Sequence, residues 1–100
     1  MADICIGHVT HYYGDLHVAA VALTDMIRIG DWLHMVGHTT DFVQPVVSLQ
    51  KDHKSIAQAG PGEEVALTVN DRVGAHDAVY RITTEEAQEL EDGRMPERAW

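Results

Sequence analysis

Seven histidines in a chain of 100 residues are the first candidates for chemistry, because imidazole binds metals and transfers protons. Histidines share one metal ion most simply when they lie two apart on a strand or four apart on a helix. His8 and His11 are three apart, which puts them on opposite faces of a regular strand. His34 and His38 are separated by a strand-ending Gly37. We therefore expect no metal site and no cofactor. A histidine-based metal-binding barrel, assembled from distant residues, is the alternative.

The nucleophiles occur without the neighbours that would activate them. A catalytic cysteine needs a histidine that lowers its pKa and a third group that orients the histidine. Cys5 lies in an apolar run instead, and we expect a small buried thiol there. Ser48 and Ser55 lack the context of a nucleophile elbow, and the adjacent Glu63 and Glu64 follow a turn, where carboxylates are solvated. The sequence thus predicts no catalytic residues and no enzyme, with a small hydrolase as a third interpretation.

The polar run His38-Thr39-Thr40-Asp41 has two interpretations. A turn can be stabilised by Thr and Asp side chains that bond the local backbone. The same run can instead form a binding lip. At about 3.3 Å per residue, a straight strand would place Gln50 about 26 Å from Phe42, so a shared lip requires a bend, which we expect at Pro45. The candidate binding residues are His38, Thr39, Thr40, Asp41, Gln50 and His53.

The charge of the chain restricts its partners. Seven basic and sixteen acidic residues give a net charge of −9, whereas nucleic-acid binding draws its affinity mainly from cations placed against phosphates. We expect no strong binding to bare nucleic acid. With one cysteine there is no intrachain disulfide, which is typical of a reducing compartment. No segment reaches the roughly 20 apolar residues of a membrane span, and residues 1–4 do not begin a signal peptide, so a cytoplasmic protein without membrane contact is expected.

Apolar residues alternate with a period of two along most of the chain, which predicts strands. Turn signals such as Gly14-Asp15 and Gly30-Asp31 separate them. We therefore expect an all-β domain over residues 1–83, a six-stranded closed antiparallel barrel. Residues 84–100 form an acidic tail, which we expect to be flexible or a short helix capped by Thr83 or Thr84. The six expected strands cover residues 4–13, 16–23, 32–36, 42–49, 65–69 and 78–82.

The order of the turn motifs resembles that of a known barrel. Ile27–His34 contains an apolar-x-x-Gly-Asp-x-apolar turn, and Ala59–Leu67 contains Gly60-Pro61-Gly62 before an alternating strand. With these motifs the sequence resembles the second domain of elongation factor Tu over about residues 4–82. Through Gly37–Phe42 and Gln50–His53 it resembles small stand-alone relatives of that barrel more closely still.

The resemblance implies a six-stranded closed barrel of the translation elongation factor domain-2 type. It also implies a non-catalytic binding or interaction module with a protein or ribonucleoprotein partner. No Gly-x-x-x-x-Gly-Lys-Ser/Thr loop is present in the sequence, since neither Lys51 nor Lys54 follows a glycine, so GTP binding is not expected. The sequence leaves the partner and the oligomeric state open.

Overall fold

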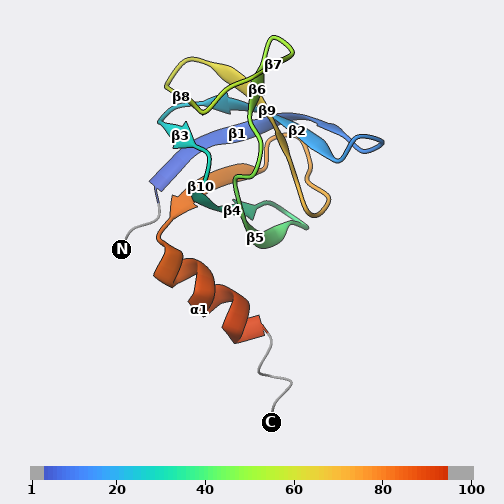
Figure 1. The fold of residues 1–100 in the computed structure, drawn as a ribbon. Coiled ribbons are helices and arrows are strands. Elements are labelled where there is room, and N and C mark those ends of the chain that lie inside the picture. Colours follow the sequence, from blue (N-terminus) through green and yellow to red (C-terminus); the bar gives the residue numbers. More distant parts are fainter. Residues whose placement is uncertain (1–3, 95–100) are drawn as a thin grey trace.

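The structure is a computed structural model that describes residues 4–94, with side chains described up to residue 89. Within this range it contains ten strands followed by one helix (Figure 1). The strands are β1 (Ile4–Tyr13), β2 (Val18–Leu23), β3 (Ile27–Arg28), β4 (Trp32–Val36), β5 (Asp41–Pro45), β6 (Gln50–Lys51), β7 (Lys54–Ser55), β8 (Gln58–Ala59), β9 (Glu64–Thr68) and β10 (Ala78–Ile82), and the helix is α1 (Thr84–Arg94). The expectation of an all-β domain is confirmed for the part that precedes α1.

Most of the strands join one large antiparallel sheet. Its order is β5-β4-β10-β1-β2-β9-β6-β7, and β3 and β8 form a separate pair. The expected closed six-stranded barrel is not found, because β5 and β7 stand at opposite ends of this order and do not pair with each other. Pro45, which has no N–H to donate, is the last residue of β5. Residues 46–49, which were expected to continue this strand, belong to no strand. The two-residue strands β6, β7 and β8 follow from residue 50 on.

The inner face of the sheet carries the main hydrophobic core. Ile6, Val21, Leu33 and Val79 have no exposed surface, and burial of each such side chain contributes about 1.5–3 kcal/mol. Because neighbours along a strand face opposite sides, Cys5 points away from the core that Ile6 enters. Cys5 is exposed, so the expectation of a buried thiol is wrong.

Strand β1 is irregular at two points. Its register shifts between Cys5 and Gly7 and again between Val9 and His11. A Cβ on Gly7 would lie 2.3 Å from the carbonyl oxygen of Ala22, so the approach of β1 to β2 at the first bulge requires glycine. The second bulge shifts the alternation of faces along β1. The ring centroids of His11 and Tyr13 lie 4.3 Å apart, with the ring planes tilted by 52°.

Helix α1 builds a second, smaller core on the sheet (Figure 1). The Thr83 hydroxyl accepts the Glu86 N–H at 3.0 Å and thereby caps the first turn. Ala87 has no exposed surface and packs with Val43 and Ile82. The helix thus covers part of the edge formed by β4, β5 and β10. Residues 95–100 of the expected tail lie outside the described residues.

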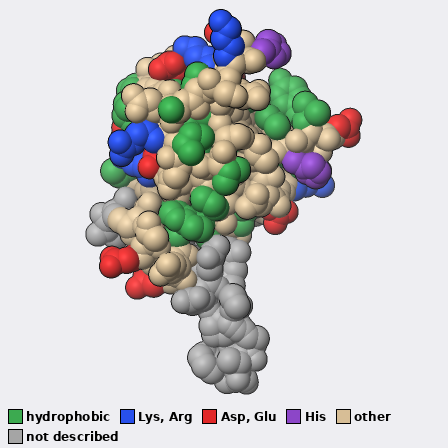
Figure 2. All heavy atoms as spheres, in the orientation of Figure 1, with side chains coloured by type: hydrophobic (Ala, Val, Ile, Leu, Met, Phe, Trp, Pro, Cys, Tyr) green, Lys and Arg blue, Asp and Glu red, His purple; other side chains and the backbone are tan. Residues whose placement is uncertain are grey.

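Within residues 4–94, no helix is long and apolar enough to cross a membrane. On the face shown in Figure 2, basic, acidic and histidine side chains are interspersed, and the hydrophobic side chains form small separate groups. That face carries no continuous block of a single charge.

Candidate functional site

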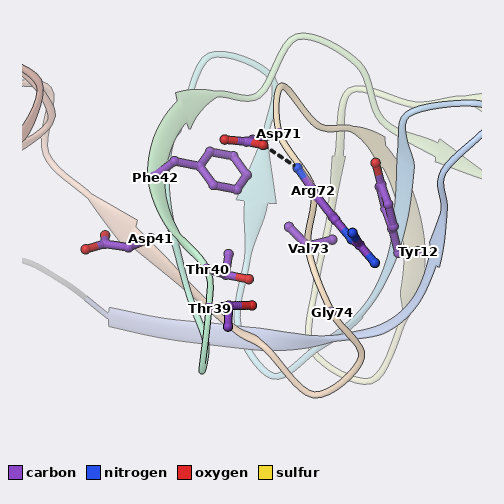
Figure 3. A pocket seen from close by; sticks show the side chains of 9 residues that line it. All are labelled: Tyr12, Thr39, Thr40, Asp41, Phe42, Asp71, Arg72, Val73 and Gly74. Carbon is purple, nitrogen blue, oxygen red and sulfur yellow. Dashed lines mark hydrogen bonds between the residues drawn. The ribbon is translucent and has the colours of Figure 1, made fainter.

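A hollow of about 500 Å³ lies where three separate segments meet (Figure 3). The segments are the end of β1, the turn that leads into β5, and the connection from β9 to β10. The residues that line it are Tyr12, Thr39, Thr40, Asp41, Phe42, Asp71, Arg72, Val73 and Gly74. We refer to it below as the Arg72 hollow.

A buried carboxylate holds two of these segments together. Asp77, which is 8% exposed, accepts the hydroxyl of Thr40 at 2.5 Å and the backbone N–H of Gly74 at 2.7 Å through one oxygen, Oδ2. Its other oxygen lies so close to Gly37 that a Cβ there would be 1.9 Å away. Asp77 therefore fixes the turn before β5 against the turn before β10, and Gly37 provides the space for its carboxylate.

A buried amide holds the third side of the hollow. Gln44 on β5 is 1% exposed, and its Nε2 donates to the Thr68 carbonyl oxygen at 2.8 Å and, more weakly, to that of Pro45 at 3.3 Å. Its Oε1 accepts the Asn70 N–H at 2.6 Å. The side chain of Gln44 thereby links β5 to the end of β9, where no backbone pairing joins these two strands, and it positions the segment that leads to Arg72.

Three donors face this hollow without a partner among the described residues: the guanidinium of Arg72 and the hydroxyls of Tyr12 and Thr39. The carboxylate of Asp71 accepts the backbone N–H of Arg72 at 2.7 Å. Figure 3 shows the guanidinium directed away from that carboxylate and toward Tyr12. The same view shows Asp41 turned away from the other lining side chains, and its Oδ1 lies 2.6 Å from Nε2 of His34.

The sequence-predicted lip is divided between two places. Thr39, Thr40 and Asp41 line the Arg72 hollow, although the Thr40 hydroxyl is engaged with Asp77. Gln50 and His53 line a second hollow of about 490 Å³. It is built from β2, β6, β9 and the two hairpins β1–β2 and β6–β7, and its other lining residues are Tyr13, Leu16, Val18, Ala20, Lys51, Asp52, Glu64, Val65 and Ala66.

The described part of the chain does not bring the two groups of lip residues to one hollow. His38 is exposed and lines neither hollow. β5 ends at Pro45, and Gln50 lies on β6, near the opposite end of the sheet order. His53 instead occupies a tight hairpin turn, in which Asp52 and His53 both have positive φ, at 53° and 66°. This backbone matches the twist of the flanking strands.

The second hollow contains an ion pair at its edge. Lys51 Nζ lies 2.7 Å from Glu63 Oε1, and Glu63 Oε2 also accepts the Gly60 N–H at 2.9 Å. The hydrogen bond from Lys51, followed by that from Gly60, lowers the pKa of Glu63. The hydrogen bond to Glu63 likewise raises the pKa of Lys51. The pair thus favours the charged forms of both groups.

Within residues 4–89, no three His, Cys, Asp or Glu side chains lie close enough together to hold a metal ion. His8 and His11 are both exposed on β1. Three other histidines, His17, His53 and His76, occupy turn positions with positive φ.

Sequence reasoning missed the residues that organise the Arg72 hollow. Gln44 and Asn70 are 26 positions apart, and Thr40 and Asp77 are 37 apart, so no local pattern connects them. Arg72 appears in the sequence only as one of several dispersed cations. Asn70-Asp71 is a turn signal of the kind that places side chains at the surface, and it was the one local signal for this segment.

The sequence was compared with families of known proteins and with individual proteins. No family model matches the chain. It is 38% identical over 78 residues, 77% of its length, to an uncharacterized protease of Methanocaldococcus jannaschii. The chain spans 19% of the length of that curated relative.

Solved structures reproduce the fold. The C-terminal domain of a Geobacillus thermoleovorans protein assigned to the U32 peptidases superposes with a TM-score of 0.73, covering 77% of this chain and 90% of that domain at 19% identity. The selenomethionine variant of the same domain gives a TM-score of 0.72, with coverage of 76% and 96% and an identity of 20%. The chain therefore has the fold of this domain.

These findings correct two expectations. The resemblance to the second domain of elongation factor Tu, and the non-catalytic translation-factor-like module that it implied, are contradicted by the relative and by the solved structures. The motifs behind that resemblance are turn motifs, such as the one at Gly30-Asp31, and their chemistry serves any antiparallel sheet with tight turns. The expectation of no enzyme is contradicted as well, because the relative is named as a protease.

Proposed function

We propose that this chain works as the β-domain of a U32-type peptidase, the counterpart of the Geobacillus C-terminal domain, and thus as part of an enzyme that cleaves peptide bonds. The observation that carries the proposal is the 38% identity over 78 residues to the M. jannaschii protease. The fold adds to it, since the superposition covers 90% of the Geobacillus domain and not a fragment of it.

Within such a peptidase, the domain holds the polypeptide on which the enzyme acts. Concave sites with a few convergent polar groups are where proteins bind ligands, and the Arg72 hollow has this character. Its walls come from three segments that are cross-linked by buried side chains, Gln44 and Asp77. A hollow fixed in this way loses little conformational entropy when a ligand enters.

The proposal includes a partner and a location. The protein partner is the remainder of the peptidase, and the net charge of −9 opposes strong binding to bare nucleic acid. A single exposed Cys5 without a disulfide partner suits a reducing compartment, so we place the protein in the cytoplasm.

Association in trans tests this function. The M. jannaschii protease is produced without the 78-residue matching segment, and its binding to the intact 100-residue chain is measured by calorimetry. The excised segment itself is the positive control, and an unrelated β-domain of similar charge is the negative control. We expect saturable one-to-one binding of this chain. Binding of the excised segment without any binding of this chain would contradict the proposal.

A further inference from the structure

The unpaired guanidinium in the Arg72 hollow has a specific ligand preference. Arginine presents its N–H donors as a planar fork that fits both oxygens of a carboxylate. Tyr12 and Thr39 add hydroxyl donors on the same hollow. Neither hydroxyl nor the guanidinium has a partner among the described residues. The walls of the hollow thus offer several hydrogen-bond donors.

The carboxylates in and next to this hollow have other partners. Asp71 accepts the backbone N–H of Arg72, Asp77 accepts Thr40 and Gly74, and Asp41 lies against His34. The chain has sixteen acidic residues and seven basic ones, so a guanidinium left without a carboxylate partner in a concave site is unexpected. An external carboxylate would complete the set of contacts.

Two further properties narrow the class of ligand. Phe42 and Val73 also line the hollow, and Figure 3 shows both apolar side chains among the polar ones. An apolar group next to the carboxylate would contact them. Among the residues that the structure describes, Arg72 is the only cation that lines this hollow. The chain as a whole is strongly negative, so a polyanion such as a nucleic acid is disfavoured. A volume of about 500 Å³ accommodates one or two residues of a peptide.

We propose that the Arg72 hollow binds a peptide carboxylate that is flanked by an apolar side chain, with Arg72 as the charged contact and Tyr12 and Thr39 as hydrogen-bond donors. The assignment of this carboxylate to a polypeptide substrate rests on the proposed function, whereas the binding itself is a property of this chain. The carboxylate can be the C-terminus of a peptide or an acidic side chain, and the experiment below distinguishes the two sources.

Amide chemical shifts of the ¹⁵N-labelled 100-residue chain are followed during titration with three probes. The first is acetyl-Ala-Ala-Leu with a free C-terminal carboxylate, the second is the same peptide with a C-terminal amide, and the third is acetyl-Leu-Asp-Ala-amide. We expect saturable shifts at Thr39, Arg72 and Gly74 with a free carboxylate, and a dissociation constant of about 1–10 mM, as befits a small ligand. Saturation by the first probe alone identifies a peptide C-terminus, and saturation by the third alone identifies an acidic side chain.

Two arginines form a matched pair for the control. Arg28 and Arg72 each donate the backbone N–H to a nearby aspartate carboxylate in a turn, and both are exposed, but Arg28 does not line the hollow. We expect Arg72→Gln to weaken carboxylate binding at least about tenfold, as loss of a charge-assisted bond would, and Arg28→Gln to leave it unchanged. Tyr12→Phe keeps the ring and should weaken binding by a smaller factor.

Several results would overturn the proposal. The first is saturable binding of the second probe, which has no carboxylate, as strong as that of the first or third probe. The others are equal loss in Arg28→Gln and Arg72→Gln, and absence of saturable shifts at the hollow with all three probes. Retained dispersion of the amide spectrum shows that each variant is folded. Loss of carboxylate binding together with intact association in trans would remove this inference alone. Carboxylate binding without association would remove the proposed peptidase function alone.

Discussion

Replacement of Gln44 by leucine tests how the structure holds its candidate site. Leucine has a similar volume and keeps the position apolar, but it removes the three hydrogen bonds that Gln44 makes to the carbonyl oxygens of Pro45 and Thr68 and to the N–H of Asn70. Because Gln44 is 1% exposed, water does not replace those bonds at the side chain itself. The link between β5 and the end of β9 is lost.

The expected cost follows from these bonds. A hydrogen bond contributes about 0.5–1.5 kcal/mol net, and a buried group left without its partner costs about 1–3 kcal/mol. Part of this loss is offset by the added apolar burial of leucine and by hydration of Asn70, which is exposed. We expect Gln44→Leu to reduce the free energy of unfolding by about 2–4 kcal/mol, which corresponds to a fall in Tm of about 10–25 °C for a domain of this size.

Urea unfolding and amide hydrogen exchange measure the two consequences separately. The Asn70 amide should exchange faster in Gln44→Leu, because its acceptor is removed. The neighbouring Val69 amide, which donates to the His17 carbonyl oxygen at 2.9 Å, serves as an internal reference. Gln58→Leu, at an exposed position on β8, is the matched control and should change stability by less than about 0.5 kcal/mol. An unchanged Asn70 exchange rate, or equal stability of the two variants, would refute this account of Gln44.

Four further predictions concern other contacts. Gly37→Ala should destabilise the fold by about 2–4 kcal/mol in urea unfolding, because its Cβ would lie 1.9 Å from Asp77 Oδ1; the loss should be less than additive with Asp77→Ala, and additive losses would exclude the clash. Ala87→Asp should cost about 2–4 kcal/mol by placing a charge where no surface is exposed, and an unchanged Tm would mean that α1 does not dock. Glu63→Gln should destabilise the protein at pH 7, because Lys51 and Gly60 lower the pKa of Glu63 below its ordinary 4.5. The difference in the free energy of unfolding between the variant and wild type should vanish as the pH falls through this lowered pKa. A difference that persists at low pH would contradict the pairing. Calorimetry should detect neither GTP binding nor salt-dependent micromolar RNA binding, because the net charge is −9, and a steep salt slope would disprove this.

The sequence predicts the long strands better than it predicts the short strands or the candidate site. Alternation located the long strands because their burial is itself alternating, as in β2 and β4. The two-residue strands β6, β7 and β8 are too short to carry any period. In β1, the bulge between Val9 and His11 changes which residues share a face. A pattern of period two does not reveal such a bulge.

The candidate site was only half predictable for a related reason. The polar run at Thr39-Thr40 marks a surface turn, and this turn does line the Arg72 hollow. The residues that fix the hollow act over long separations in the chain, as in the bond between Thr40 and Asp77. Gln44 appears in the sequence as one polar residue in an apolar strand, and its role follows only from the position of Asn70 beside it in the fold. The mistaken likeness to a translation factor has the same origin, since turn motifs report local backbone geometry and not function.

Peptide-bond cleavage by a chimera is the most direct test that this chain is the β-domain of a U32-type peptidase. In the chimera, this chain replaces the 78-residue matching segment of the M. jannaschii protease, and hydrolysis of unfolded casein is measured as kcat/KM beside the intact protease and the version without the segment. The account predicts that the chimera restores cleavage lost by deletion, and that Gln44→Leu within it lowers kcat/KM. A chimera that folds but cleaves no faster than the deleted version would contradict the account.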